Sequence, residues 1–216
     1  MTIFTPSTLH GLKKLILAPH VDDECLGLGG LIDSTTHILH FGCAENQNHG
    51  LKFHSRSERI LEFQQVQSYT SCQSTLLNHP VNNYSTSSLI SDIEGSLNTL
   101  RPDIVFIPNP SYNQDHQAVY DASVIALRPH DLNHNPPVVL VYYQPQDIWQ
   151  PRSPIDPSVF IGVDVERHLH VYSLLASQVR SHRSPDLIRA MLKVYGACIG
   201  NEYALPFKLL RLALSR

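Results

Sequence analysis

The 216-residue chain is 42% hydrophobic and 16% charged, a balance typical of a globular protein that can bury a sizeable core. Its formal net charge of −3 offers no basic surface for a phosphate backbone, which argues against a nucleic-acid partner. Residues 1–14 lack the charged segment and long apolar run of a signal peptide, and no apolar stretch is long enough to cross a membrane. We therefore expect a soluble, cytoplasmic protein without a transmembrane segment.

The cysteine pattern argues against a disulfide scaffold and against a thiolate zinc site. The four cysteines are scattered along the chain and form no C-x-x-C pair. Because free cysteines are commonly buried, we expect buried free thiols in a reducing compartment.

Apolar runs of strand length alternate with segments of helical spacing along the chain. The predicted strands are residues 15–18, 37–41, 104–107, 138–143 and 159–165. The predicted helices are residues 55–77, 88–100, 115–127, 169–179, 185–195 and an amphipathic end at 207–214. This alternation predicts an α/β fold with a mainly parallel sheet flanked by helices. The proline-rich span 136–157 is interpreted as a surface excursion, so residues 1–216 are expected to form one domain.

Two polar clusters follow predicted strands. Residues 20–24 (HVDDE) come directly after the first strand, and residues 113–116 (NQDH) follow the strand at 104–107. Ligands of a parallel α/β sheet bind in the crevice beyond the carboxyl ends of its strands. We therefore expect the two clusters to converge although they are far apart in the sequence.

The residue types in these clusters suit a catalytic metal ion. Zinc in such sites takes three nitrogen or carboxylate ligands and keeps one position for water. His20 and Asp23 stand at a turn entering a helix, and His116 can supply the third ligand. Asp22 would then take a proton from the water as general base. On spacing alone, aspartates that cap helices explain the same residues.

A set of motifs in the same order resembles the LmbE-like (PIG-L) de-N-acetylase family. Residues 18–24 (APHVDDE) and the glycines that follow resemble its H-P-D-D-E signature, with Val21 in place of the usual proline. Further matches are its R-x-x-E helix, its RPDVVF strand, its H-P-D-H-x-x-V motif and its S-Q pair, at residues 59–62, 101–106, 113–119 and 177–178. The matches cover roughly the whole chain and are far more specific together than singly.

The resemblance implies a Rossmann-like, LmbE-like fold that holds one zinc ion per chain. It implies His20, Asp23 and His116 as the zinc ligands, Asp22 as the general base, and Asp115 as a carboxylate that supports a ligand. The implied reaction is removal of the N-acetyl group from an amino sugar, such as N-acetylglucosamine, or from its conjugate. The implied partner is therefore a small molecule.

Asn113 departs from the family pattern. It stands where many members have a histidine, and asparagine can donate a hydrogen bond to an oxyanion but cannot carry a proton. Either Asp22 serves first as base and then as acid, or another residue supplies the acid. The candidates for that acid are His130, His134 and Tyr112.

A second departure lies near the end of the chain. Residues 203–207 (YALPF) resemble a family Y-A-E-x-F segment in which Leu205 replaces the acid. The replacement affects either a contact near the substrate or helix packing. Residues 207–214 are expected to pack on the domain as a terminal helix rather than to touch a membrane.

Other functions remain to be weighed against the deacetylase. One is a non-catalytic Rossmann-like domain that binds a sugar or nucleotide, although it would have no need of the complete residue set. Residues 27–30 (GLGG) do not form the G-x-G-x-x-G pattern, so small residues that allow close packing explain them better than dinucleotide binding. Trp149 and Tyr142–Tyr143 suit either a sugar ring or core packing. The sugar, its aglycone, the acyl group, the native metal and the oligomeric state, a homo-oligomer included, stay open.

Overall fold

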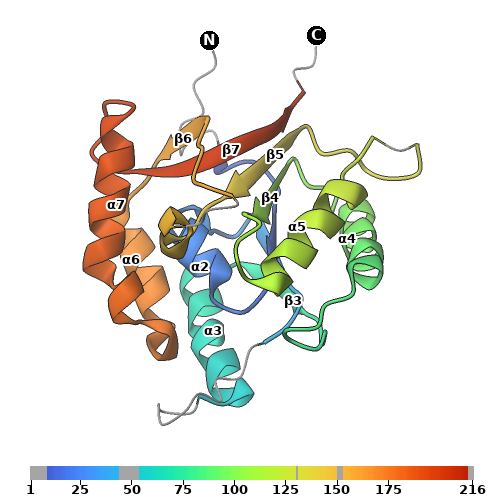
Figure 1. The fold of residues 1–216 in the computed structure, drawn as a ribbon, viewed down its shortest axis with the longest axis horizontal. Helices are drawn as coiled ribbons and strands as arrows, with labels where there is room; N and C mark the ends of the chain where they lie inside the picture. Colours follow the sequence, from blue (N-terminus) through green and yellow to red (C-terminus); the bar gives the residue numbers. More distant parts are fainter. Residues whose placement is uncertain (1–8, 44–53, 130, 150–152, 214–216) are drawn as a thin grey trace.

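The computed structural model describes residues 9–43, 54–129, 131–149 and 153–213, and within them one sheet contains seven strands. The strand order is β3-β2-β1-β4-β5-β7-β6 (Figure 1). The strands are β1 (Lys14–Ala18), β2 (Thr36–His40), β3 (Gln73–Leu76), β4 (Ile104–Pro108), β5 (Val138–Tyr142), β6 (Val159–Gly162) and β7 (Ala204–Leu212). The first five strands in the sequence pair in parallel, whereas β7 runs antiparallel to β5 and β6. The prediction of a mainly parallel α/β sheet is confirmed.

Helices cover both faces of this sheet. They are α2 (Asp23–Leu28), α3 (Arg56–Thr70), α4 (Thr86–Leu100), α5 (Gln114–Ala126), α6 (Val165–Ser173) and α7 (Pro185–Ala197). Short 3-10 turns are η1 (Gly29–Leu31), η2 (Pro145–Trp149), η3 (Ala176–Gln178) and η4 (Ser181–Arg183). Figure 1 shows α4 and α5 on one side of the sheet and α6 and α7 on the other.

The alternation of side chains along the strands divides the core into two clusters. On β1, Leu15 and Leu17 pack with α4 and α5, whereas Ile16 and Ala18 pack with α2, α3, α6 and α7. Strands buried on both faces read as continuous apolar runs, which is why β1, β4 and β5 are visible in the sequence.

Local capping explains where several helices begin. The side chains of Ser55, Asn113, Asp164 and Ser184 each accept a hydrogen bond from a backbone N–H in the first turn of α3, α5, α6 and α7. Such caps satisfy a backbone donor that has no partner inside the helix. The cap at Asn113 also fixes the start of the helix that carries one of the candidate ligands.

Two secondary-structure predictions are wrong. Residues 207–212 belong to β7 and not to a terminal helix, because long-range pairing with β5 and β6 overrides their helical spacing. The predicted helix 55–77 ends at Thr70, where Ser71 adopts a left-handed conformation with φ 60°, and β3 follows. The edge strand β3 is only four residues long and half exposed, so it carries no buried apolar run.

Close packing around the glycines after β1 is confirmed. A Cβ on Gly27 would lie 2.5 Å from Cδ2 of Tyr142, and one on Gly29 would lie 3.0 Å from the carbonyl oxygen of His168. These glycines let α2 and η1 approach β5 and α6. No nucleotide is required to explain them.

The span 136–157 is not a surface excursion. It contains β5 and η2, and Tyr142, Tyr143, Gln144 and Asp147 are buried, so core packing explains both tyrosines. The side chain of Trp149 lies outside the described residues.

The expectation of buried free thiols is right for all but one cysteine. Cys25, Cys43 and Cys72 are buried and free, whereas Cys198 is exposed. Helix α7 ends at Ala197, so Cys198 lies just beyond it and is reached by solvent. None of the helices in the described ranges has the length and hydropathy of a membrane span.

Candidate metal centre

The two polar clusters meet at the carboxyl edge of the sheet. His20 follows β1, and His116 lies in the first turn of α5, which follows β4. Strands β1 and β4 are neighbours, and β2 lies on the other side of β1, so the strand order reverses direction between β1 and β4. Such a reversal opens a crevice in a doubly wound sheet, and the site occupies this position.

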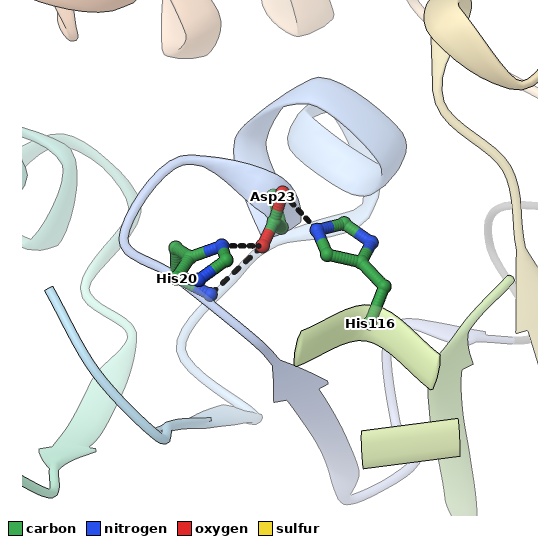
Figure 2. A group of neighbouring side chains, drawn as sticks. All are labelled: His20, Asp23 and His116. Atoms are coloured by element: carbon green, nitrogen blue, oxygen red, sulfur yellow. Dashed lines mark hydrogen bonds and ion pairs between the residues drawn. The ribbon is translucent and has the colours of Figure 1, made fainter. Parts of the chain in front are cut away.

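His20, Asp23 and His116 form a compact group of buried donors. One ligand atom from each residue lies within 4.8 Å of the others. Nδ1 of His20 is 3.5 Å from Oδ2 of Asp23, and Nε2 of His116 is 3.3 Å from Oδ1 of the same carboxylate. Figure 2 shows the two rings facing the carboxylate from opposite sides.

Asp115 orients the ring of His20. Nε2 of His20 lies 2.8 Å from Oδ2 of Asp115, which also accepts a 2.7 Å hydrogen bond from the backbone N–H of Asn82. A carboxylate only accepts, so Nε2 of His20 carries the proton and Nδ1 is the nitrogen left for a metal. Asp115 therefore supports His20, the candidate ligand from the other cluster, rather than its sequence neighbour His116.

The loop before α4 packs against the same histidine. The ring of Tyr84 lies 5.9 Å from that of His20, and its hydroxyl donates a 2.7 Å hydrogen bond to the carbonyl oxygen of Pro19. Asn82 takes a left-handed conformation, with φ 65°, to direct its N–H at Asp115. Neither residue belongs to a recognised motif.

The electrostatics of the group favour a cation. Burial alone would raise the pKa of Asp23, but His116 and His20 outweigh it and hold the pKa well below its usual range. Burial alone would lower the pKa of His20, but its hydrogen bonds to Asp115 and Asp23 raise it to about 9. A metal ion that binds here must therefore displace a proton from His20.

Gln144 is a contact that the sequence patterns did not indicate. Its Nε2 donates a 2.7 Å hydrogen bond to Oδ1 of Asp23, and its own backbone N–H donates to Asp147 at 2.9 Å. It stands just after β5, at the same sheet edge as the two clusters. A polar residue at the end of a parallel strand was the available signal.

Asp22 is held by two guanidinium groups. Its Oδ1 lies 3.1 Å from a terminal nitrogen of Arg59, and its Oδ2 lies 3.1 Å from one of Arg183. Arg183 also donates a 3.0 Å hydrogen bond to Oε1 of Gln178. These contacts fix the Asp22 side chain next to the candidate ligand Asp23.

The remaining motif residues support the arrangement of Asp22 and its two arginine partners. Glu62 accepts hydrogen bonds from the N–H and the hydroxyl of Ser177, at 2.7 and 2.6 Å, and so ties α3 to η3. Glu24 is fully buried, with its Oε2 3.1 Å from Nε2 of His40 and 3.2 Å from the N–H of Asp22. The R-x-x-E and S-Q motifs thus carry the contacts that position Asp22.

The three candidates for a general acid differ in their position relative to the site. Nε2 of His134 lies 2.8 Å from the carbonyl oxygen of Pro102, at the opposite edge of the sheet, so His134 is excluded. His130 lies outside the described residues, as do residues 44–53 of the loop expected to select the substrate. Tyr112 is exposed beside Asn113. The side-chain oxygen of Asn113 caps α5 by accepting from Asp115 N, so its amide NH₂ is the group left to donate.

The donor set fits zinc. Two histidine nitrogens and one carboxylate match the ligands of catalytic zinc sites, and one donor atom from each residue lies within 4.8 Å of the others. Oδ1 of the buried Asp115 has no hydrogen-bond partner among the described residues, which adds negative charge beside the group.

The sequence matches a family model over residues 15–127, which is more than half of the chain. The model describes GlcNAc-PI de-N-acetylase, the PIG-L family. The chain belongs to this family. No curated protein matches the chain.

Solved structures share this fold over almost the whole chain. The conserved protein TT1542 from Thermus thermophilus is 21% identical with a TM-score of 0.75, covering 95% of this chain and 97% of its own. N,N'-diacetylchitobiose deacetylase from Pyrococcus horikoshii is 19% identical with a TM-score of 0.73. The match covers 94% of this chain and 85% of the deacetylase chain.

A third structural neighbour is named for a different reaction, a hydration. GalB, the 4-carboxy-2-hydroxymuconate hydratase from Pseudomonas putida, is 14% identical with a TM-score of 0.69, covering 94% of this chain and 98% of its own. At these identities the neighbours establish the fold, and the reaction has to be argued from the site.

Proposed function

We propose that this PIG-L family member is a zinc-dependent de-N-acetylase of an amino sugar or its conjugate. The observation that carries the proposal is the convergence of His20, Asp23 and His116 around one point, with a fixed carboxylate, Asp22, beside them. The family match and the chitobiose deacetylase among the structural neighbours support the reaction and the class of substrate.

His20, Asp23 and His116 would hold the metal, through Nδ1, the carboxylate and Nε2 respectively. When bound, zinc supplies a Lewis acid that polarises the amide carbonyl and acidifies water. Asp115 and Gln144 hold the ligands in place, so little of the site has to reorganise on binding.

Asp22 is the proposed general base. Arg59 and Arg183 each occupy one side of its carboxylate, but a carboxylate offers about four lone-pair positions, so a proton can still be accepted. The two arginines hold the Asp22 carboxylate in a fixed orientation. Asp22 is also the proposed donor of the proton to the leaving amine, serving first as base and then as acid.

Asn113 is the proposed hydrogen-bond donor to the oxyanion. Its side-chain oxygen is committed to the first turn of α5, which fixes the direction of its NH₂ group. A donor held in place before reaction stabilises developing negative charge without reorganisation.

The test begins with metal content. We expect about one zinc per wild-type chain, purified without a metal-affinity tag and measured by elemental analysis, and a loss of zinc in His116→Ala. His134→Ala is the matched control, because that histidine lies at the opposite sheet edge. A wild type that neither holds zinc nor takes it up on titration would remove the metal centre.

The second measurement is acetate release from N-acetyl amino sugars. Asp22→Asn should keep its zinc and lose about 10²- to 10⁴-fold in kcat, the range typical of a lost general base. Full activity in this variant would remove Asp22 from the base role. A zinc-loaded wild type that releases no acetate would indicate a different reaction, such as the hydration carried out by the neighbour GalB.

A further inference from the structure

Asn82 has a backbone conformation that no helix end explains. In the described ranges three residues other than glycine have a positive φ, namely Ser71, Asn82 and Arg101. Ser71 and Arg101 are the C-caps of α3 and α4, where a left-handed residue commonly ends a helix. Asn82, with φ 65°, lies instead in the loop between β3 and α4. Residues held in this conformation cluster at functional sites, so the contacts of Asn82 need an explanation.

A tight turn sets the conformation of Asn82. The N–H of Asn83 donates a 3.0 Å hydrogen bond to the carbonyl oxygen of Pro80, which closes a β-turn over residues 80–83. A positive φ at the third position and not at the second is the pattern of a type II turn, which favours glycine or asparagine there. A β-branched side chain at position 82 would be strained in this conformation.

The turn is anchored to the loops that follow β1 and β2. The N–H of His79 donates a 3.0 Å hydrogen bond to the carbonyl oxygen of Phe41, and the hydroxyl of Tyr84 donates a 2.7 Å hydrogen bond to that of Pro19. The ring of Tyr84 also lies 5.9 Å from the ring of His20. These contacts fix the position of the turn relative to the first polar cluster.

The second polar cluster holds the backbone of Asn82. Its N–H donates a 2.7 Å hydrogen bond to Oδ2 of the fully buried Asp115, and its carbonyl oxygen accepts one from the side chain of Gln114. Oδ2 of Asp115 also lies 2.8 Å from Nε2 of His20, whereas Oδ1 has no hydrogen-bond partner in the part of the chain that the structure describes. Two donors, on His20 and Asn82, therefore orient the Asp115 side chain through one oxygen.

We propose that Asn82 is a positioning residue of the metal centre, which acts through its backbone N–H on Asp115 and thereby on the ring of His20. The inference rests on the proposed function, because His20 is a ligand only if a metal binds. A turn that served only to connect β3 and α4 would not need to direct an N–H at a buried carboxylate. The side chain of Asn82 is exposed, so the residue is required for its conformation and not for its amide group.

Three substitutions separate the conformation of residue 82 from its side chain. Asn82→Gly keeps access to a positive φ and should bind zinc like the wild type. Asn82→Val disfavours a positive φ, so we expect zinc to bind about 10- to 100-fold more weakly, as is typical when a partner of a ligand is lost. Asn82→Ala, which is less strained, should show the same loss to a smaller degree. The dissociation constant is measured by competition with a chelator, and the visible spectrum of the cobalt-substituted protein should change in parallel.

Ser71→Val is the matched control. Ser71 also has a positive φ, 60°, but it is exposed and lies between the end of α3 and the start of β3, at the amino edge of the sheet. The control should lower the melting temperature, as Asn82→Val does, and keep the wild-type affinity for zinc. Equal zinc affinities and cobalt spectra in Ser71→Val and Asn82→Val would show that the strain at position 82 affects stability alone, and would overturn the inference.

A second experiment needs neither zinc nor turnover. In the metal-free protein the proton on Nε2 of His20 is buried against Asp115, so it exchanges slowly with water and can be observed by NMR downfield of the backbone amides. We expect this resonance to be kept in Asn82→Gly and to be shifted or lost in Asn82→Val. Such a dependence in a protein that binds no zinc would support the action of Asn82 on His20 and contradict the proposed metal centre. Zinc binding and acetate release that are unaltered in Asn82→Val would leave the deacetylase standing and remove Asn82 from this role.

Discussion

The orientation of the Asp23 carboxylate depends on a side chain that is not itself a candidate ligand and on the backbone of His20. Its Oδ1 accepts from Gln144 at 2.7 Å and its Oδ2 accepts from the backbone N–H of His20 at 2.8 Å. These two donors fix the plane of the carboxylate, so each oxygen faces one of the two histidines. Gln144 therefore orients a candidate metal ligand without being one itself.

Replacing Gln144 with methionine keeps the size of the side chain and removes its N–H donor. We expect the affinity for zinc to fall by about 10- to 100-fold, as is typical when a partner of a ligand is lost. The dissociation constant is measured by competition with a chelator. The visible spectrum of the cobalt-substituted protein should change as well, because the geometry at Asp23 changes.

Gln67→Met is the matched control for this prediction. Gln67 also donates a side-chain hydrogen bond, to Ser74, but does so at the end of α3 away from the metal centre. The control should bind zinc like the wild type. Unaltered zinc affinity and an unaltered cobalt spectrum in Gln144→Met would show that Asp23 is oriented without it.

The candidate ligands could be predicted from the sequence and their supporting contacts could not. His20, Asp23 and His116 stand in motifs directly after strands, so a topological rule places them together. Gln144 and Asn82 reach the site from loops whose side chains and backbone conformation no local pattern specifies. Their roles depend on tertiary distances that only the folded chain fixes.

At the scale of elements, the packing of α6 on η1 depends on a neutral histidine. His168 is fully buried, and its Nδ1 accepts a 3.1 Å hydrogen bond from the N–H of Gly30. Burial lowers the pKa of His168 to about 4, although the backbone of Leu26 opposes the shift. A protonated His168 could not accept from Gly30, so the contact requires the neutral ring.

This contact makes stability depend on pH. The unfolded chain takes up the proton at the ordinary pKa near 6.5, whereas the folded chain resists until about pH 4. The contribution of His168 is therefore complete above pH 6.5 and is lost as the pH falls from 6.5 to 4, by about 3 kcal/mol in total. Urea unfolding at a series of pH values measures the slope.

His168→Asn provides the comparison, because an asparagine oxygen can accept from Gly30 but does not titrate. We expect the difference in stability between variant and wild type to shrink or reverse as the pH falls from 6.5 to 4. A constant difference across this range would mean that His168 titrates alike in the folded and unfolded states.

Strand β7 shows where element prediction from the sequence fails. Residues such as Lys208 and Leu209 favour helices, and the spacing of the segment is amphipathic, yet both residues pair with β5. The first four residues of β7 are buried and the next three are exposed, so the strand shows no alternation of period two. Leu205, where the family has an acid, is buried in this strand and serves packing.

For the molecule as a whole, we expect the fold to be independent of a metal at the candidate centre. The two hydrophobic clusters lie on opposite faces of the sheet, whereas the candidate ligands lie beyond its carboxyl edge. Asp23 already pairs with both histidines, with Nδ1 of His20 at 3.5 Å and Nε2 of His116 at 3.3 Å. The chain can therefore hold the site in nearly its binding geometry, in contrast to small zinc domains that unfold without metal.

Removing zinc with a chelator should accordingly leave the far-ultraviolet circular dichroism spectrum unchanged and lower the melting temperature. Free zinc at about a thousand times its dissociation constant stabilises the folded state by about 4 kcal/mol. For a chain of 216 residues this corresponds to a shift of roughly 8–16 °C. His116→Ala, which cannot complete the ligand set, should melt at the same temperature with and without zinc. A loss of secondary structure on chelation would show instead that the metal holds the carboxyl edge of the sheet together, and the pairs of Asp23 would then be too weak to preserve the site alone.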